Sequence, residues 1–251
     1  MANDEILEQL KQGIDHWNGW RQAQMPPFDL SGVQLGESVL KKIDFSDTDL
    51  SEAILSRSDL SEANFSRAIL IDAQIDFAIL RRAVFTDAYL SAADLSETIL
   101  IEAVFTDAIL AEAVLRKSNL RCTNLIRANL HRADLHRAVL TEALLTKADL
   151  SEASMIGAIL IEANLTGANL NQANLSLGEL SRACLKGANL TAADLSGANL
   201  SGANFTRANL QNANLSGANL SDTVFTDANL NGVITEGANF QDAILVTEMS
   251  L

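Results

Sequence analysis

The hydrophobic positions of this chain recur every five residues over most of its length. From Leu30 to Leu245, every fifth residue is large and apolar with one exception (Thr235), and it is Leu at 34 of the 44 sites. The residue two places earlier is Ala at 32 of the 44. A period of five fits neither an α-helix nor an extended strand. The pattern predicts a chain that turns a corner in every group of five and sends one large and one small apolar residue inward on each side.

The phenylalanines indicate how many sides close one coil. Phe45, Phe65, Phe85 and Phe105 are twenty residues apart, and a further pair with the same spacing is Phe205 and Phe225. Rings that stack at one place in the interior require twenty residues per coil, which is four groups of five. The sequence therefore predicts an all-β solenoid of about eleven four-sided coils with these six rings as a core ladder. Asn, Asp, Ser and Gly suit the bends between sides.

One stretch shows the repeat without interruption. Residues 193–212 read ADLSG ANLSG ANFTR ANLQN. This A-(D/N)-L-x-x motif resembles the pentapeptide repeat proteins, and the resemblance covers about residues 28–245. It implies a right-handed quadrilateral β-helix with the Leu/Phe and Ala positions inside. The N-terminal segment GIDHWNGWRQ is similar to a leader common in cyanobacterial members of that family.

The N-terminal region predicts a cap for the first coil. Residues 4–12 read as a short helix, with Asn3 as the N-cap and Gly13 as the stop. An apolar stripe suited to covering the first coil consists of Ile6, Leu7, Leu10, Ile14 and Trp17, with Trp20 nearby. Partner binding by the two tryptophans is the alternative. We expect a helical cap over residues 1–25, a β-helix over 26–245 and a tail over 246–251.

The last coil has less protection in the sequence. Thr235 breaks the interior pattern there, and an exposed coil presents an unpaired β edge that must be covered or shared. The sequence therefore gives a physical motive for a homodimer that forms end to end through the C-terminal coil.

Composition narrows the class of protein. The chain has 251 residues and a formal net charge of −14, which argues against a general nucleic-acid binder. It contains no apolar run of membrane-spanning length, and its N-terminus lacks the features of a signal peptide. Two cysteines, Cys122 and Cys184, are too few for a disulfide scaffold. We expect a cytoplasmic protein that contacts neither nucleic acid nor membrane.

The sequence offers little for catalysis. His131 and His136 fall near Cys122, but in a twenty-residue coil the histidines lie on adjacent sides and point apart, without the convergence that zinc requires. No glycine-rich strand-to-helix element is present to hold phosphate. Carboxylates on a convex rod stand in water, whereas acid–base catalysis needs a cleft. We therefore predict a protein that is not an enzyme and has no catalytic, metal or cofactor site.

Charge is distributed unevenly along the chain. Residues 43–115 sum to −10, whereas residues 116–147 sum to +5. Within this basic belt the candidate partner contacts are Lys117, Arg127, Arg132 and Arg137. Two interpretations are open. The cations relieve repulsion in columns of residues twenty apart, as in Asp107 beside Arg127, or they recognise an acidic partner.

A second candidate surface is apolar. Ile69, Ile71, Tyr89 and Ile109 fall on one side over three coils, and Tyr89 is the only tyrosine of the chain. Such residues stiffen a sheet as a β-branched ladder, or they form a contact patch on the surface. The opposite side carries a similar set that begins with Ile79 and Ile99.

These features favour a non-enzymatic scaffold that binds an unidentified protein along the sides of the rod, with a regulatory role as one possibility. The alternative is an acidic DNA mimic. The family resemblance suggests it, because some members associated with quinolone resistance are acidic rods thought to occupy the DNA-binding surface of gyrase. The basic belt and the neutral C-terminal third count against that alternative.

Overall fold

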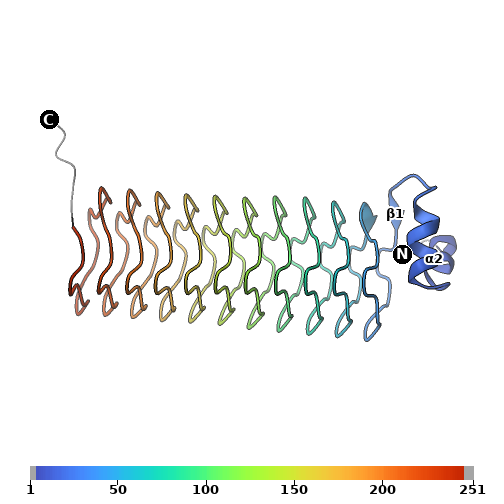
Figure 1. The fold of residues 1–251 in the computed structure, drawn as a ribbon, viewed down its shortest axis with the longest axis horizontal. Coiled ribbons are helices and arrows are strands. Elements are labelled where there is room, and N and C mark those ends of the chain that lie inside the picture. The colour runs from blue at the N-terminus through green and yellow to red at the C-terminus, as the bar shows by residue number, and fades with distance from the viewer. Residues whose placement is uncertain (1–3, 246–251) are drawn as a thin grey trace.

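The chain forms a rod of stacked coils with two helices at its N-terminal end (Figure 1). The structure is a computed structural model and describes residues 4–245. Its elements are helix α1 (Asp4–Leu10), helix α2 (Ile14–Arg21), strand β1 (Phe28–Asp29) and strand β2 (Thr48–Asp49). β1 and β2 pair in parallel, and isolated parallel bridges continue with the same offset of twenty residues as far as Val224 and Ile244. One coil therefore takes twenty residues, as the spacing of the phenylalanines predicts.

Backbone hydrogen bonds tie each coil to both of its neighbours. The N–H of Leu50 donates to the carbonyl of Ile69 in the next coil at 2.7 Å, and the N–H of Ile69 donates back to Thr48 at 3.0 Å. At the corner, the N–H of Ala53 donates to the carbonyl of Leu50 at 3.0 Å and closes a four-residue turn. The same hydrogen bonds recur along the rod, so every side both donates to and accepts from its neighbours in a parallel ladder.

Each corner contains one residue in the left-handed backbone region. At this position φ lies between 54° and 72° from Gly32 to Asp242, and glycine occupies nine of the sites. A residue with a Cβ atom is strained there by roughly 1–2 kcal/mol, whereas glycine is not. The glycines that end the groups ADLSG and ANLSG, Gly197 and Gly202, are thus explained by backbone conformation.

The Asp or Asn before the central Leu has a different role. The Oδ1 atom of Asn174 accepts the N–H of Ser176 at 3.0 Å and its hydroxyl at 2.7 Å. The Oδ1 atom of Asn214 makes the same two contacts with Ser216. We expected these amides at the bends. They stand on the flat sides instead and reach forward to fix the first residue of the corner.

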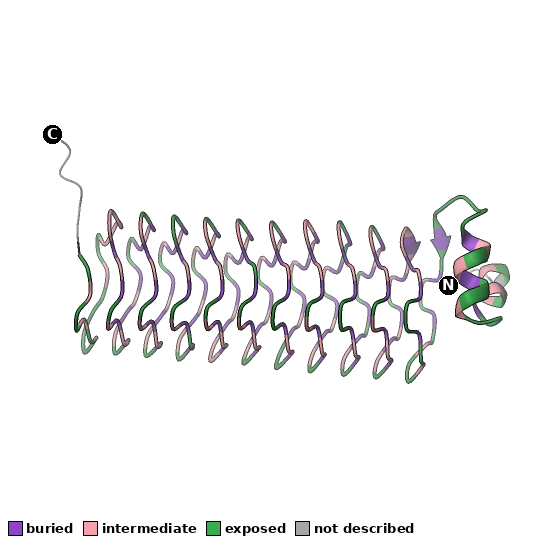
Figure 2. Ribbon diagram, in the orientation of Figure 1, coloured by how far each residue is buried: buried purple, intermediate pink, exposed green. Residues whose placement is uncertain are grey.

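The Leu, Phe and Ala positions line the interior of the rod (Figure 2). All six phenylalanines of the predicted ladder are at most 1% exposed. The ring centroids of Phe65 and Phe85 lie 4.7 Å apart, and those of Phe205 and Phe225 lie 5.2 Å apart. The core is therefore a continuous column of side chains that runs along the axis of the rod.

The N-terminal region contains two helices where the sequence predicted one over residues 4–12. Helix α1 ends at Leu10, Gly13 breaks the chain with φ 105°, and α2 follows. Short-range pattern does not reveal α2, because contacts with the first coil hold it. The predicted N-cap Asn3 and the predicted tail at 246–251 lie outside the described residues.

Side chains of α2 bond the exposed edge of the first coil. The indole N–H of Trp17 donates to the carbonyl of Asp44 at 2.7 Å, and the guanidinium of Arg21 donates to the carbonyls of Asp44 and Ser46. Trp17 is fully buried, and its ring centroid lies 6.1 Å from that of Phe45. Burial lowers the pKa of Arg21, opposed by the charge of Asp44. The helix thereby supplies the hydrogen bonds that a preceding coil would supply.

Candidate functional site

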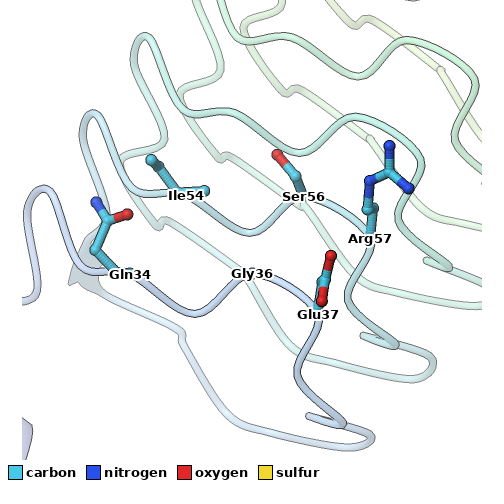
Figure 3. A pocket seen from close by; sticks show the side chains of 6 residues that line it. All are labelled: Gln34, Gly36, Glu37, Ile54, Ser56 and Arg57. Carbon is cyan, nitrogen blue, oxygen red and sulfur yellow. The ribbon is translucent and has the colours of Figure 1, made fainter.

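The hollows in the wall of the rod are shallow. Figure 3 shows one of about 400 Å³ between the first two coils, lined in part by Gly36, which has no side chain. Its lining residues are Gln34, Gly36, Glu37, Ile54, Ser56 and Arg57. A second hollow, of about 360 Å³, contains the ion pair between Arg116 and Asp134, whose Nε and Oδ2 atoms are 2.6 Å apart. The polar groups of these two hollows stand on neighbouring coils of an outer wall.

The residues first considered for metal binding have other partners. The Nδ1 atom of His131 lies 3.0 Å from the hydroxyl of Ser151, and the thiol of Cys122 lies 3.7 Å from a carboxylate oxygen of Glu142. Burial and the neighbouring Glu142 raise the pKa of the Cys122 thiol. Within residues 4–245, no three His, Cys, Asp or Glu side chains gather closely enough to hold a metal ion.

The four apolar candidates come together on one side of the rod. Ile69 pairs with Tyr89, and Tyr89 pairs with Ile109, in three successive coils. Ile71 follows on the adjoining corner, two residues after Ile69. Tyr89 is 46% exposed and Ile71 is 38% exposed, whereas Ile69 and Ile109 are half-buried. This set of four is here named the apolar ladder. Ile69, Tyr89 and Ile109 share one side, whereas Ile71, which was predicted to share it, lies on the adjoining corner.

One corner beside the apolar ladder holds two ion pairs and a carboxylate between them. The guanidinium of Arg67 donates to both oxygens of Asp47, each at 2.7 Å. The guanidinium of Arg127 likewise donates to both oxygens of Asp107. Hydrogen bonding to these carboxylates raises the pKa of both arginines, and the bond from Arg127 lowers the pKa of Asp107. Asp87 stands in the coil between the two pairs and forms no ion pair with either guanidinium, although its charge also raises the pKa of both arginines.

Asp87 is one of four exposed carboxylates around the apolar ladder that form no ion pair with a described residue. This set, here named the carboxylate rim, consists of Glu52, Asp72, Asp87 and Glu112. Over residues 47–112, this side and its two corners carry seven carboxylates and a single cation, Arg67. The excess of negative charge is therefore concentrated next to exposed apolar side chains.

The carboxylate rim does not emerge when charge is summed along the chain. The signal was available: residues twenty apart share a column, so charge summed at that interval separates the sides. On the opposite side, residues 57–122 carry six cations and five carboxylates beside the ladder of Ile79 and Ile99. Two similar apolar ladders thus stand in different electrostatic surroundings, one strongly negative and one close to neutral.

The basic belt does not form one patch. Lys117 and Arg137 lie at one corner, Arg127 at a second and Arg132 at a third. The amine of Lys117 lies 3.0 Å from Glu97, and the guanidinium of Arg132 lies 2.8 Å from Glu152, which raises the pKa of Arg132. With Arg127 bound to Asp107, three of the four candidate cations are engaged in ion pairs between coils. This arrangement agrees with the interpretation that the belt relieves repulsion within columns.

Neither described helix has the length and apolar character that crossing a bilayer would require.

Comparison with known proteins supplies the family. The model for pentapeptide repeats matches in eight copies, over residues 29–67, 68–107, 98–137, 108–146, 138–176 and 183–222. The chain is 32% identical to HetL, a pentapeptide repeat protein involved in heterocyst differentiation regulation from the cyanobacterium Nostoc sp. strain PCC 7120. That match covers 98% of this chain and 95% of HetL, with a TM-score of 0.55.

Two further solved structures are similar over part of the chain. A pentapeptide repeat protein from the cyanobacterium Cyanothece, Rfr23, is 38% identical over 44% of this chain and 63% of its own, with a TM-score of 0.15. QnrB1, a plasmid-mediated fluoroquinolone resistance protein, is 17% identical over 84% of this chain and 90% of its own, with a TM-score of 0.34. No curated protein matches. With its repeats and coils, the chain is a right-handed β-helix solenoid and belongs to the pentapeptide repeat family.

Proposed function

We propose that this protein is a non-enzymatic scaffold that binds a protein partner along the sides of its rod. In this proposal the rod has about eleven coils, begins in a helical cap and works in the cytoplasm. The observation that carries the proposal is the apolar ladder, which lies uncovered on a wall without interruptions. Exposed contiguous apolar surface in a soluble protein marks a site of interaction.

The similarity to HetL supports a regulatory setting for this binding. HetL is involved in the regulation of heterocyst differentiation, and the similarity extends over 98% of this chain. In this proposal the rod regulates its partner by covering one of the partner's surfaces, because its sides are broad and charged.

The test is capture of partners from a cyanobacterial lysate on the immobilised full chain. We expect a protein retained by the wild type to be lost from Tyr89→Asn, and its direct binding to be confirmed with both components purified. A matched control is Ile79→Asn, which makes the same kind of change in the ladder on the opposite side. Charge reversal at Arg127, Arg132 and Arg137 tests the basic belt. The proposal would be contradicted if each captured protein, once purified, bound the wild type, every variant and an unrelated acidic protein equally.

A DNA mimic that binds a topoisomerase such as gyrase is the second candidate, favoured by the carboxylates gathered on one side. Charge density weighs against it. Duplex DNA carries one negative charge per roughly 1.7 Å, or about 2.8 over the rise of one coil. Residues 26–245 sum to −11, and this charge over about eleven coils gives about 1 per coil. Inhibition of gyrase supercoiling by the purified chain, undiminished in Tyr89→Asn, would place this candidate first.

The last described coil suggests a homodimer that forms end to end. Ile234 and Ile244 are about half exposed there, at 53% and 47%. Two such coils placed against each other bury this surface and share their β edges. Analytical ultracentrifugation at increasing concentration tests this part of the proposal, and a monomer at high concentration would contradict it.

A further inference from the structure

The apolar ladder and the carboxylate rim together indicate which kind of partner would bind this side of the rod. The ladder offers three large side chains in a line, and the rim offers carboxylates that form no ion pair with a described residue. Asp87 stands two residues before Tyr89 on one edge of this side, and Asp72 and Glu112 follow Ile71 and Ala111 on the other edge. A ligand that fits carries an apolar stripe between two rows of positive charge.

The spacing of the apolar ladder indicates the secondary structure of that ligand. Successive coils are about 4.8 Å apart, so Ile69 and Ile109 are separated by about 9.6 Å along the rod. Apolar residues at i, i+3 or i+4 and i+7 of an α-helix fall at about 0, 4.5–6 and 10.5 Å along its axis. Alternate residues of a strand laid in the same direction are about 6.7 Å apart and reach about 13 Å at the third. The helix matches the ladder and the strand does not.

We propose that the apolar ladder and the carboxylate rim form a docking site for a basic amphipathic helix of a partner protein, laid along the axis of the rod. The inference rests on the proposed scaffold function and names the class of partner segment. Apolar residues at i, i+4 and i+7 of the helix contact Ile69, Tyr89 and Ile109. Lys or Arg residues on its two flanks approach Asp87 on one edge and Asp72 and Glu112 on the other.

The two neighbouring ion pairs help to keep this site negative. Because Arg67 is bound to Asp47 and Arg127 to Asp107, neither guanidinium forms an ion pair with Asp87. The side with Ile79 and Ile99 lacks this arrangement, since cations there outnumber carboxylates. A basic helix is therefore attracted to one of two similar apolar ladders and not to the other.

Tyr89 provides a direct probe, since it is the only tyrosine of the chain. The experiment titrates the full protein, labelled with ¹³C-tyrosine, with a tyrosine-free helical peptide of about 15 residues. The peptide carries Leu at i, i+4 and i+7 and Lys on both flanks. One control peptide has the same composition with Leu and Lys shuffled around the helix, and a second replaces Lys by Glu. We expect the Tyr89 signal to shift with the first peptide, with at least tenfold higher affinity than with either control.

Variants of the protein test the two parts of the site separately. Ile109→Asn places at this position the residue that the same column carries at Asn129, and we expect at least a tenfold loss of affinity. Asp72→Asn, Asp87→Asn and Glu112→Gln together have the same expected effect and flatten the dependence of affinity on salt. The matched control, Ile79→Asn with Ile99→Asn, leaves affinity within twofold. Circular dichroism and urea unfolding establish that each variant is folded.

Three results would overturn the inference: no binding of the Lys peptide at millimolar concentration, equal binding of the shuffled peptide, or binding that leaves the Tyr89 signal unmoved. Affinity that is indifferent to the three neutralised carboxylates would also overturn it. These results are distinguishable from failure of the scaffold function, because a partner captured through another side survives Ile109→Asn.

Discussion

Phe85 and Phe105 stack one coil apart in the interior of the rod, with 4.5 Å between their ring centroids and 1° between their planes. Both are fully buried, and Phe65 continues the stack on the other side of Phe85 at 4.7 Å. The pitch of the backbone thus matches the thickness of the aromatic rings closely enough for contact along the whole column.

Replacing Phe85 by Ala should lower the free energy of unfolding by about 3–5 kcal/mol, since the change removes a buried ring and leaves a cavity between two others. Urea unfolding followed by circular dichroism measures the loss. Phe85→Leu is the control and should lose less, because Leu125 occupies the same column two coils further on. A loss for Phe85→Ala smaller than that for the exposed Arg127→Ala would contradict the role of the phenylalanine column in stability.

Removing Trp17 should detach the helical cap from the first coil. Trp17→Ala deletes a fully buried ring and the hydrogen bond to the carbonyl of Asp44, with an expected loss of about 3–5 kcal/mol. Because each coil contacts only its neighbours, amide exchange should accelerate most in the first coils. Trp20→Ala, at a half-buried position, should have a smaller effect. Uniform acceleration along the rod would show that the cap does not act locally.

The left-handed corners allow a reciprocal pair of substitutions. Gly187 and Ala192 occupy the same corner position on successive sides, with φ 63° and 55°. Gly187→Ala should destabilise by about 1 kcal/mol and Ala192→Gly should stabilise by a similar amount, since the Cβ atom is strained in this conformation. No heavy atom lies within 4 Å of a Cβ atom added to Gly187, so steric contact does not contribute. Equal signs for the two changes in urea unfolding would refute the explanation of the glycine pattern.

Stability should decrease in acid through Asp29 and Asp107. The backbone N–H of Ser31 lowers the pKa of Asp29, and the guanidinium of Arg127 lowers that of Asp107. A carboxyl with a lower pKa in the folded state contributes stability above its unfolded value of about 3.9, and this is lost as pH falls through the folded value. Urea midpoints measured from neutral pH down to about pH 2 should therefore drop below about pH 4. Asp107→Asn should show a shallower drop than the wild type, and an unchanged drop would exclude Asp107 as a contributor.

The repeat in the sequence was sufficient to predict most of the fold. The Leu and Ala positions point inward because each side packs the same residue types in the same way. The spacing from Phe45 to Phe65 equals the length of one coil. Helix α2 could not be predicted in this way. Its segment is short and has no regular apolar pattern, and its partners Asp44 and Ser46 lie more than twenty residues further along the chain.

The candidate surface was only half predicted, for a similar reason. Most of the apolar ladder follows from the sequence, because Ile69, Tyr89 and Ile109 are twenty residues apart and all large and apolar. Asp87 was not singled out, since its importance depends on where Arg67 and Arg127 place their guanidinium groups. Side-chain geometry determines which neighbouring carboxylate in a column an arginine binds, and residue spacing alone does not predict it.

The fixed length of each coil has a consequence for how the surface can change. Insertion or deletion of one group of five residues preserves every inward Leu and Ala, but it rotates all later columns by a quarter turn. The fold would be preserved, but the apolar and charged residues beyond that point would lie on different sides of the rod. Only a change of twenty residues leaves the pattern of each side intact. Packing of the hydrophobic interior therefore tolerates any change of length in multiples of five residues. A partner that recognises the exterior tolerates only changes in multiples of twenty.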